Sequence, residues 1–130
     1  MTVRNIAGID WQANQPIVVS SVSQLKKILQ DFSEHPPGII ELSSARGERL
    51  QLGLGGGFGF AEFLKADNMP PYLCATPRKL HTMQDTKFLC GGTPTEIGPL
   101  NCLSVEEAME VAEYFFENAQ PSPNFKWEEV

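Results

Sequence analysis

Two stretches of alternating apolar residues, joined by a run of glycines, constrain this 130-residue chain more than any other feature. Residues 50–54 read Leu-Gln-Leu-Gly-Leu, and residues 58–62 read Phe-Gly-Phe-Ala-Glu. Alternation with a period of two is typical of strands with one buried face. The glycines at 55–57 can adopt the positive φ angles that a tight turn requires. The pattern predicts a β-hairpin with Gly56, Gly57 and Phe58 at its tip.

Two predicted helices flank this hairpin in the sequence. Apolar residues at helical spacing predict a helix over 22–34, which the prolines at 36 and 37 end. Ser104 and Glu107 have the spacing of a capping box, which predicts a second helix from there to about Asn118. The expected buried faces are Val22, Leu25, Ile28, Leu29 and Phe32 in the first helix and Ala108, Val111, Ala112, Phe115 and Phe116 in the second.

Short apolar stretches bounded by turn residues predict the remaining strands. They cover residues 6–11, 16–19, 39–42, 72–75, 87–90 and 124–128. Two helices separated by a block of strands are typical of an α+β domain. We therefore expect one domain spanning residues 1–130, built as an antiparallel β-sheet with two main helices packed on one face.

The composition excludes several classes of protein. Apolar residues make up 42% and charged residues 20% of the chain, which is typical of a globular protein. No apolar run approaches the roughly 20 residues that span a bilayer, and the first residues lack the apolar segment of a signal peptide. A cytoplasmic location is therefore expected. The three cysteines include no Cys-x-x-Cys pair, so neither a disulfide framework nor a zinc knuckle is indicated.

Motifs for catalysis or cofactor binding are weak. The glycine run lacks the last glycine of a dinucleotide-binding motif, and no Gly-Lys-Ser/Thr follows it. Cys74 or Cys90 could form a nucleophilic pair with His81 if the fold brought them together, but small apolar cysteines in strands are the alternative. We expect no enzymatic activity, no cofactor and no metal site.

The negative charge is concentrated in the C-terminal quarter. Residues 1–95 hold nine Lys or Arg against eight Asp or Glu, whereas residues 96–130 hold one lysine against eight glutamates. Direct binding to nucleic acid or to an anionic membrane through the C-terminal region is therefore disfavoured. A basic protein partner is favoured, because complementary charge steers association.

Four of these glutamates form a stripe on the second predicted helix. Glu106, Glu110, Glu113 and Glu117 recur at intervals of four, three and four, opposite the apolar face. The helix dipole favours negative charge in the first turn and disfavours it toward the C-terminus. The helix itself contains no Lys or Arg. The stripe is either a partner-binding surface or a solvated outer face.

The C-terminal region also resembles a known family. The stretch 103–108, followed by Ala112, Phe115-Phe116, Pro121 and Trp127-Glu128, is similar to the ending of a family of bacterial immunity proteins from polymorphic toxin systems. The hairpin at 50–60 is similar to the family's central hairpin. The family has a glycine near the helix end, where this chain has Asn118-Ala119-Gln120, and Asn118 could supply a left-handed cap there. The loop 66–87 has no clear counterpart in the family.

The resemblance implies a protein that binds and neutralises a cognate toxin domain, often a deaminase. Such a toxin, or a nuclease, needs a basic surface for its nucleic-acid substrate, and an acidic inhibitor could occupy that surface. Trp11 and Trp127 are expected in the core, with interface anchors as the alternative. Other possible functions are a general interaction module without a toxin partner and a small Cys/His enzyme. The expected charge contacts are Glu106, Glu110, Glu113, Glu117 and Glu128, with the hairpin tip at Gly56, Gly57 and Phe58 as a second contact.

Overall fold

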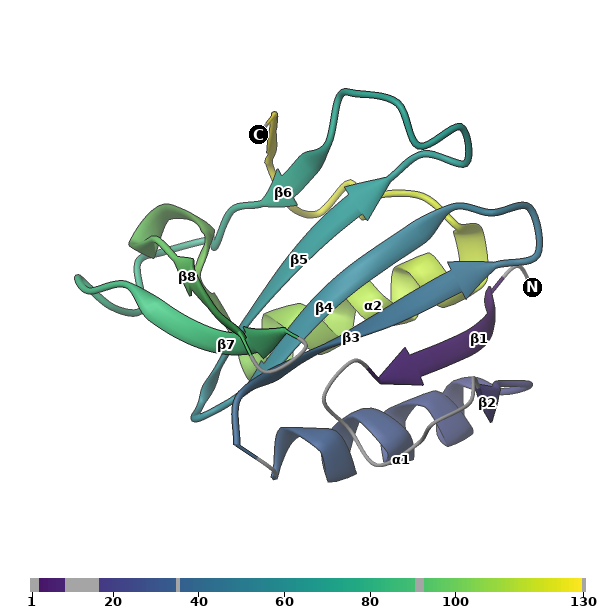
Figure 1. Ribbon diagram of the computed structural model, residues 1–130, viewed down its shortest axis with the longest axis horizontal. Helices are drawn as coiled ribbons and strands as arrows, with labels where there is room; N and C mark the ends of the chain where they lie inside the picture. The colour runs from purple at the N-terminus through teal and green to yellow at the C-terminus, as the bar shows by residue number, and fades with distance from the viewer. Residues whose placement is uncertain (1–2, 9–16, 35, 91–92, 130) are drawn as a thin grey trace.

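The computed structural model describes residues 3–8, 17–34, 36–90 and 93–129. Within these ranges the chain has a mixed α+β fold of strands and two α-helices (Figure 1). The elements are β1 (Val3–Gly8), β2 (Ile17–Val18), α1 (Val22–Ser33), β3 (Gly38–Ser44), β4 (Arg49–Gly55), β5 (Phe58–Leu64), β6 (Leu73–Ala75), β7 (Thr86–Cys90), β8 (Thr93–Ile97), the 3-10 helix η1 (Pro99–Asn101), β9 (Leu103–Ser104), α2 (Val105–Asn118) and β10 (Trp127–Glu129). Trp11 and the rest of 9–16 lie outside the described residues.

The sheet is mostly antiparallel but mixed. Seven strands follow one path in the order β10-β6-β5-β4-β3-β1-β2, with antiparallel neighbours throughout. β7 pairs in parallel with β3, where Gly38 lies opposite Leu89. The expectation of a purely antiparallel sheet is wrong at this point. β1 pairs with β3 as far as Gly8 opposite Ile40, and β7 pairs with β3 beyond that point, at Gly38.

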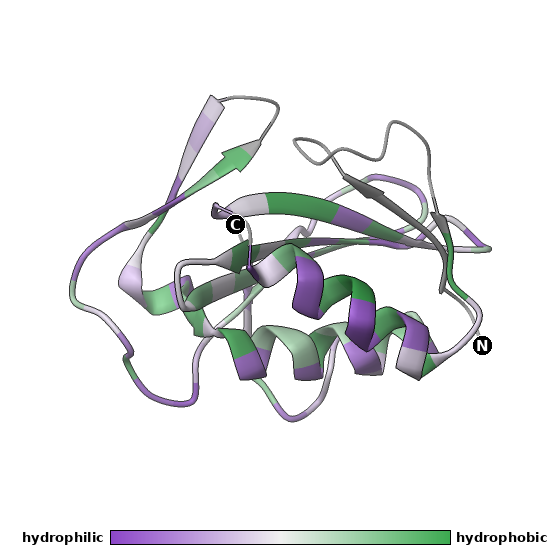
Figure 2. Ribbon diagram, turned by 90° about the horizontal axis from the view of Figure 1, so that it is seen from below, coloured by the Kyte–Doolittle hydropathy of each residue, from purple (hydrophilic) through white to green (hydrophobic). Residues whose placement is uncertain are grey.

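Both helices pack on one face of the sheet, as the sequence predicts. Leu25, Leu29 and Phe32 of α1 join the buried face of α2 in the main hydrophobic core. The same core takes in the strand residues Ile40, Leu42, Leu50, Leu52 and Leu54. Figure 2 shows both helices on one side of the sheet, with β7 and β8 rising on the other side. We call the sheet surface opposite the helices the front face, because it is turned toward the viewer in Figure 1.

The cap at the start of α2 is the predicted one, whereas the cap at its end differs from the prediction. The Ser104 hydroxyl accepts a hydrogen bond from the backbone of Glu107, and the Glu107 side chain accepts one from the backbone of Ser104. This capping box confirms the predicted start of the helix. At the other end the left-handed residue is Ala119, with φ of 55°, so the expectation that Asn118 takes this conformation is wrong. Asn118 instead remains the last helical residue.

The predicted hairpin is present as β4 and β5. Gly56 and Gly57 form the turn with φ of 63° and 86°, values that side chains rarely tolerate. The sequence predicts one buried face for this hairpin, but both faces are buried near its tip. There Ile39, Phe60 and Phe88 form a second hydrophobic cluster on the front face. The antiparallel pair of β7 and β8, which we call the β7–β8 arm, covers that end of the sheet.

Candidate functional site

The middle of the predicted acidic stripe is paired within the molecule. Arg78 Nη2 lies 2.6 Å from Oε2 of Glu110, and Asn124 Nδ2 donates to the same oxygen at 3.3 Å. Lys26 Nζ of α1 lies 3.6 Å from Oε1 of Glu113. The cations that α2 lacks are therefore supplied by α1 and by the loop before β7.

The ends of the stripe differ from its middle. The side chains of Glu106 and Glu117 are exposed, and neither forms an ion pair within the part of the chain that the structure describes. Glu106 and Glu113 line a hollow between the helices whose other walls include Lys26 and Lys27. The outer surface of the helix layer is therefore mixed in charge near α1, and its uncompensated carboxylates lie at the two ends of α2.

The side chain of Glu107 forms hydrogen bonds both with the loop 76–85 and with the start of α2. Glu107 is buried, with a side chain that is 8% exposed, and its Oε1 lies 2.6 Å from Nε2 of His81. Oε2 accepts a hydrogen bond from the backbone N–H of Arg78 at 3.0 Å. Burial alone would raise the pKa of Glu107, but the bonds donated by the backbones of Arg78 and Ser104 and by His81 lower it below its usual value. The sequence predicts the capping contact between Glu107 and Ser104, but not the contacts of Glu107 with Arg78 and His81 in the distant loop.

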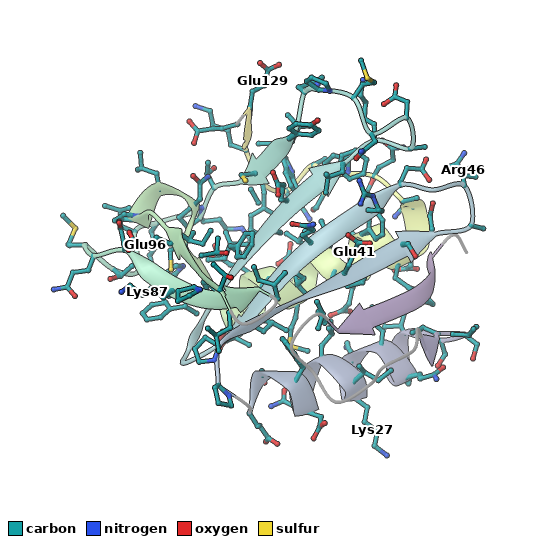
Figure 3. The ribbon with its side chains drawn as sticks, in the orientation of Figure 1. Lys27, Glu41, Arg46, Lys87, Glu96 and Glu129 are labelled. Atoms are coloured by element: carbon teal, nitrogen blue, oxygen red, sulfur yellow. The ribbon has the colours of Figure 1, made fainter. Side chains whose placement is uncertain are left out.

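A second group of carboxylates lies on the front face of the sheet. Strand register places Glu41 opposite Gln51, Gln51 opposite Glu62, Glu62 opposite Cys74, and Cys74 opposite Glu128. Directly opposed residues of antiparallel strands point to the same face. These five residues therefore form one row across β3, β4, β5, β6 and β10, which we call the acidic row. Figure 3 shows Glu41 projecting from the middle of the front face.

The charges of the acidic row are unevenly compensated. Arg49 Nη1 and Gln51 Nε2 each lie 3.5 Å from Oε2 of Glu41. Glu62 is half-buried and has no ion pair with the described residues, and burial raises its pKa. An uncompensated carboxylate at such a position lowers the stability of the folded chain at neutral pH.

The thiol of Cys74 is poorly suited to nucleophilic chemistry. Burial, then the negative charges of Glu62 and Glu128, raise its pKa to about 12. Nucleophilic cysteines need the opposite shift, because the thiolate is the reactive form. The Nε2 atom of His81 is occupied by Glu107 rather than by a sulfur atom. The side chain of Cys90 lies outside the described residues.

A hollow of about 320 Å³, lined by both apolar and charged residues, adjoins the β10 end of the acidic row. Its walls include Leu80 and Leu100, which are 49% and 65% exposed. Glu128 belongs both to this hollow and to the acidic row, and Lys79 and Lys126 also line the hollow. Large exposed leucines that flank a hollow are a common feature of protein interaction sites. The sequence does not reveal this hollow, because its walls come from three separate segments, at 76–80, at Leu100 and at 126–128.

The hairpin tip and Trp127 contribute to packing. Gly56 approaches Pro37, a Cβ atom at Gly57 would meet nothing within 4 Å, and Phe58 packs against the second hydrophobic cluster. Trp127 packs against the main core as expected, and its Nε1 donates to the carbonyl oxygen of Ser122 at 2.8 Å. The structure therefore places the predicted contacts in three separate regions: the α2 stripe, Glu128 on the front face, and the hairpin tip.

Within the described ranges, no cluster of three or more His, Cys, Asp or Glu side chains could hold a metal ion. None of the helices found there has the length and apolar character that a membrane crossing requires. Neither a scan against known family models nor a search of curated proteins finds a match for this chain.

Proposed function

We propose that this chain is an immunity protein that binds a cognate bacterial toxin domain in the cytoplasm and blocks its active site or substrate path. The toxin would act on nucleic acid, as a deaminase or a nuclease. The chain would work by binding alone, without catalysis or a cofactor.

The observation that carries this proposal is the set of carboxylates without cations. Glu62 and Glu128 lie on the front face of the sheet, and neither has an ion pair among the described residues. Glu62 is half-buried, so its charge is poorly solvated and weakens the folded chain. A lysine or arginine of a basic partner would compensate this charge.

A growth-protection experiment tests this function. The C-terminal domain encoded by the gene immediately upstream would be expressed in a bacterial host, with and without this chain. We expect the domain alone to stop growth and the chain to restore it. Leu52 is fully buried in the main core, so Leu52→Asp provides an unfolded control that should not protect. Growth arrest that persists with the wild-type chain would contradict the proposal and favour a general interaction module.

A further inference from the structure

Among the described residues, the β7–β8 arm is the element that covers the front face of the sheet. The two helices cover the other face, and Phe88 of the arm packs against Ile39 and Phe60 at one end of the front face. Beyond the arm, Glu41 stands on the open part of the sheet in Figure 3. A sheet surface of this kind is available for docking without any rearrangement of the described elements.

The charge of this open face indicates the chemistry of its occupant. Glu41, Glu62 and Glu128 lie in one row, and among the described residues Arg49 is the cation that pairs with a member of the row. Glu62 is held half-buried without a cation, where its charge is poorly solvated. A lysine or arginine of a partner could form an ion pair with Glu62, and this ion pair would stabilise the carboxylate in the complex relative to the free protein.

The hollow beside Glu128 adds an apolar contact to this charged row. Interfaces combine a few apolar anchors in pockets with a polar surround. Leu80 and Leu100 form the apolar walls, whereas Lys79 and Lys126 make this end of the surface mixed in charge. The hollow therefore suits an apolar side chain, and the row beyond it suits cations.

We propose that the partner docks on the front face, with its basic residues over the acidic row and an apolar side chain in the hollow between Leu80 and Leu100. This inference rests on the proposed function, and the occupant is the basic substrate-binding surface of the toxin domain. The α2 stripe is the competing surface. It is less suited to this role because Lys26 and Arg78 already pair with Glu113 and Glu110.

The test compares two double variants with the same change in net charge. Glu62→Gln with Glu128→Gln removes the two charges of the acidic row that have no cation among the described residues, and Glu106→Gln with Glu117→Gln removes the two such charges at the ends of the stripe. The affinity of each purified full-length chain for the upstream-encoded toxin domain would be measured by biolayer interferometry. We expect the row variant to bind at least about tenfold more weakly than wild type and the stripe variant to stay within about twofold.

A second pair of variants tests the apolar anchor. Leu100→Ala removes an exposed wall of the hollow, and Val18→Ala is a matched control on β2, since these residues are 65% and 64% exposed. We expect about tenfold weaker binding for Leu100→Ala and no change for Val18→Ala, with unchanged thermal unfolding of both.

The possible failures can be told apart. Wild-type affinity in the row variant, or a larger loss in the stripe variant, would overturn the docking surface and leave the immunity function in place. A wild-type chain that does not bind the toxin domain would overturn the proposed function, and the docking inference with it.

Discussion

Oε1 of Glu107 lies 2.6 Å from Nε2 of His81, although the two residues are 26 positions apart in the sequence. The same carboxylate caps α2 and accepts a hydrogen bond from the backbone N–H of Arg78. One buried side chain therefore joins the start of a helix to the loop before β7.

Replacement of Glu107 by Gln should destabilise the protein. The amide cannot accept all the hydrogen bonds that the carboxylate accepts, so we expect the free energy of unfolding to fall by about 1–3 kcal/mol. Urea unfolding followed by circular dichroism would measure this change. Glu106→Gln is the matched control, because that neighbouring side chain is exposed and should have an effect within about 0.5 kcal/mol. Equal urea midpoints of unfolding for Glu107→Gln and Glu106→Gln would contradict this role of Glu107.

Glu107 should also contribute to the acid sensitivity of the fold. Its pKa is lowered in the folded state from an ordinary value of 4.5. The stability that it contributes is therefore present above pH 4.5 and is lost as the pH falls below that value toward the folded pKa. Unfolding free energies measured from pH 7 to pH 3 should decline less steeply in Glu107→Gln than in wild type. If the two proteins lose unfolding free energy in parallel between pH 7 and pH 3, another group controls the loss of stability at low pH.

Glu62 should show the opposite dependence. Burial raises its pKa above 4.5, so its ionisation costs stability as the pH rises from the unfolded pKa through the folded pKa. We expect Glu62→Gln to raise the melting temperature at pH 7 while it weakens binding to the toxin domain. Glu41→Gln is the control, because Glu41 lies beside Arg49 and its neutralisation should bring no gain. A lower melting temperature for Glu62→Gln would contradict the view that its charge is uncompensated.

The close approach of α2 to β5 depends on Gly59. A Cβ atom there would lie 2.7 Å from Cβ of Ala108 and 2.9 Å from the carbonyl oxygen of Gly53. We expect Gly59→Ala to destabilise the fold by about 1–3 kcal/mol, because the helix must shift. In a double-mutant cycle, Ala108→Gly should recover part of this loss. Fully additive effects of the two substitutions would contradict the contact.

Native Cys74 should react slowly with thiol reagents. Its pKa of about 12 leaves almost no thiolate at neutral pH, and its side chain is buried. Iodoacetamide labelling read by peptide mass spectrometry should modify Cys74 in the unfolded protein at least about a hundredfold faster than in the native protein. Rapid native labelling would instead support a reactive cysteine and the alternative of a small Cys/His enzyme.

The predictions that succeeded rest on local patterns. The capping box at Ser104 and the glycine turn at Gly56 and Gly57 each involve residues within four positions of one another. The apolar faces of α1 and α2 follow from helical periodicity. All five residues predicted for α2 are buried, whereas in α1 Leu25, Leu29 and Phe32 are buried and Val22 and Ile28 are partly buried. Such features can be read from one stretch of sequence because the interactions that produce them lie within that stretch.

The features that were missed depend on contacts between distant segments. β8 contains Pro94 and few apolar residues, and it becomes a strand because β7 supplies a pairing edge. The acidic row requires the register of five strands. The cations that pair with the α2 stripe, Lys26 and Arg78, lie 87 and 32 positions from Glu113 and Glu110. An acidic stripe in the sequence therefore did not reveal which of its charges remain available to a partner.

Calorimetric titration of the full chain into the upstream-encoded toxin domain, at low and at high salt, tests the immunity function most directly. We expect a Kd of about 1 nM or below at low salt and clearly weaker binding at high salt, since charges on an acidic face would meet a basic surface. The absence of binding heat and of any complex on gel filtration would contradict an immunity function for this protein.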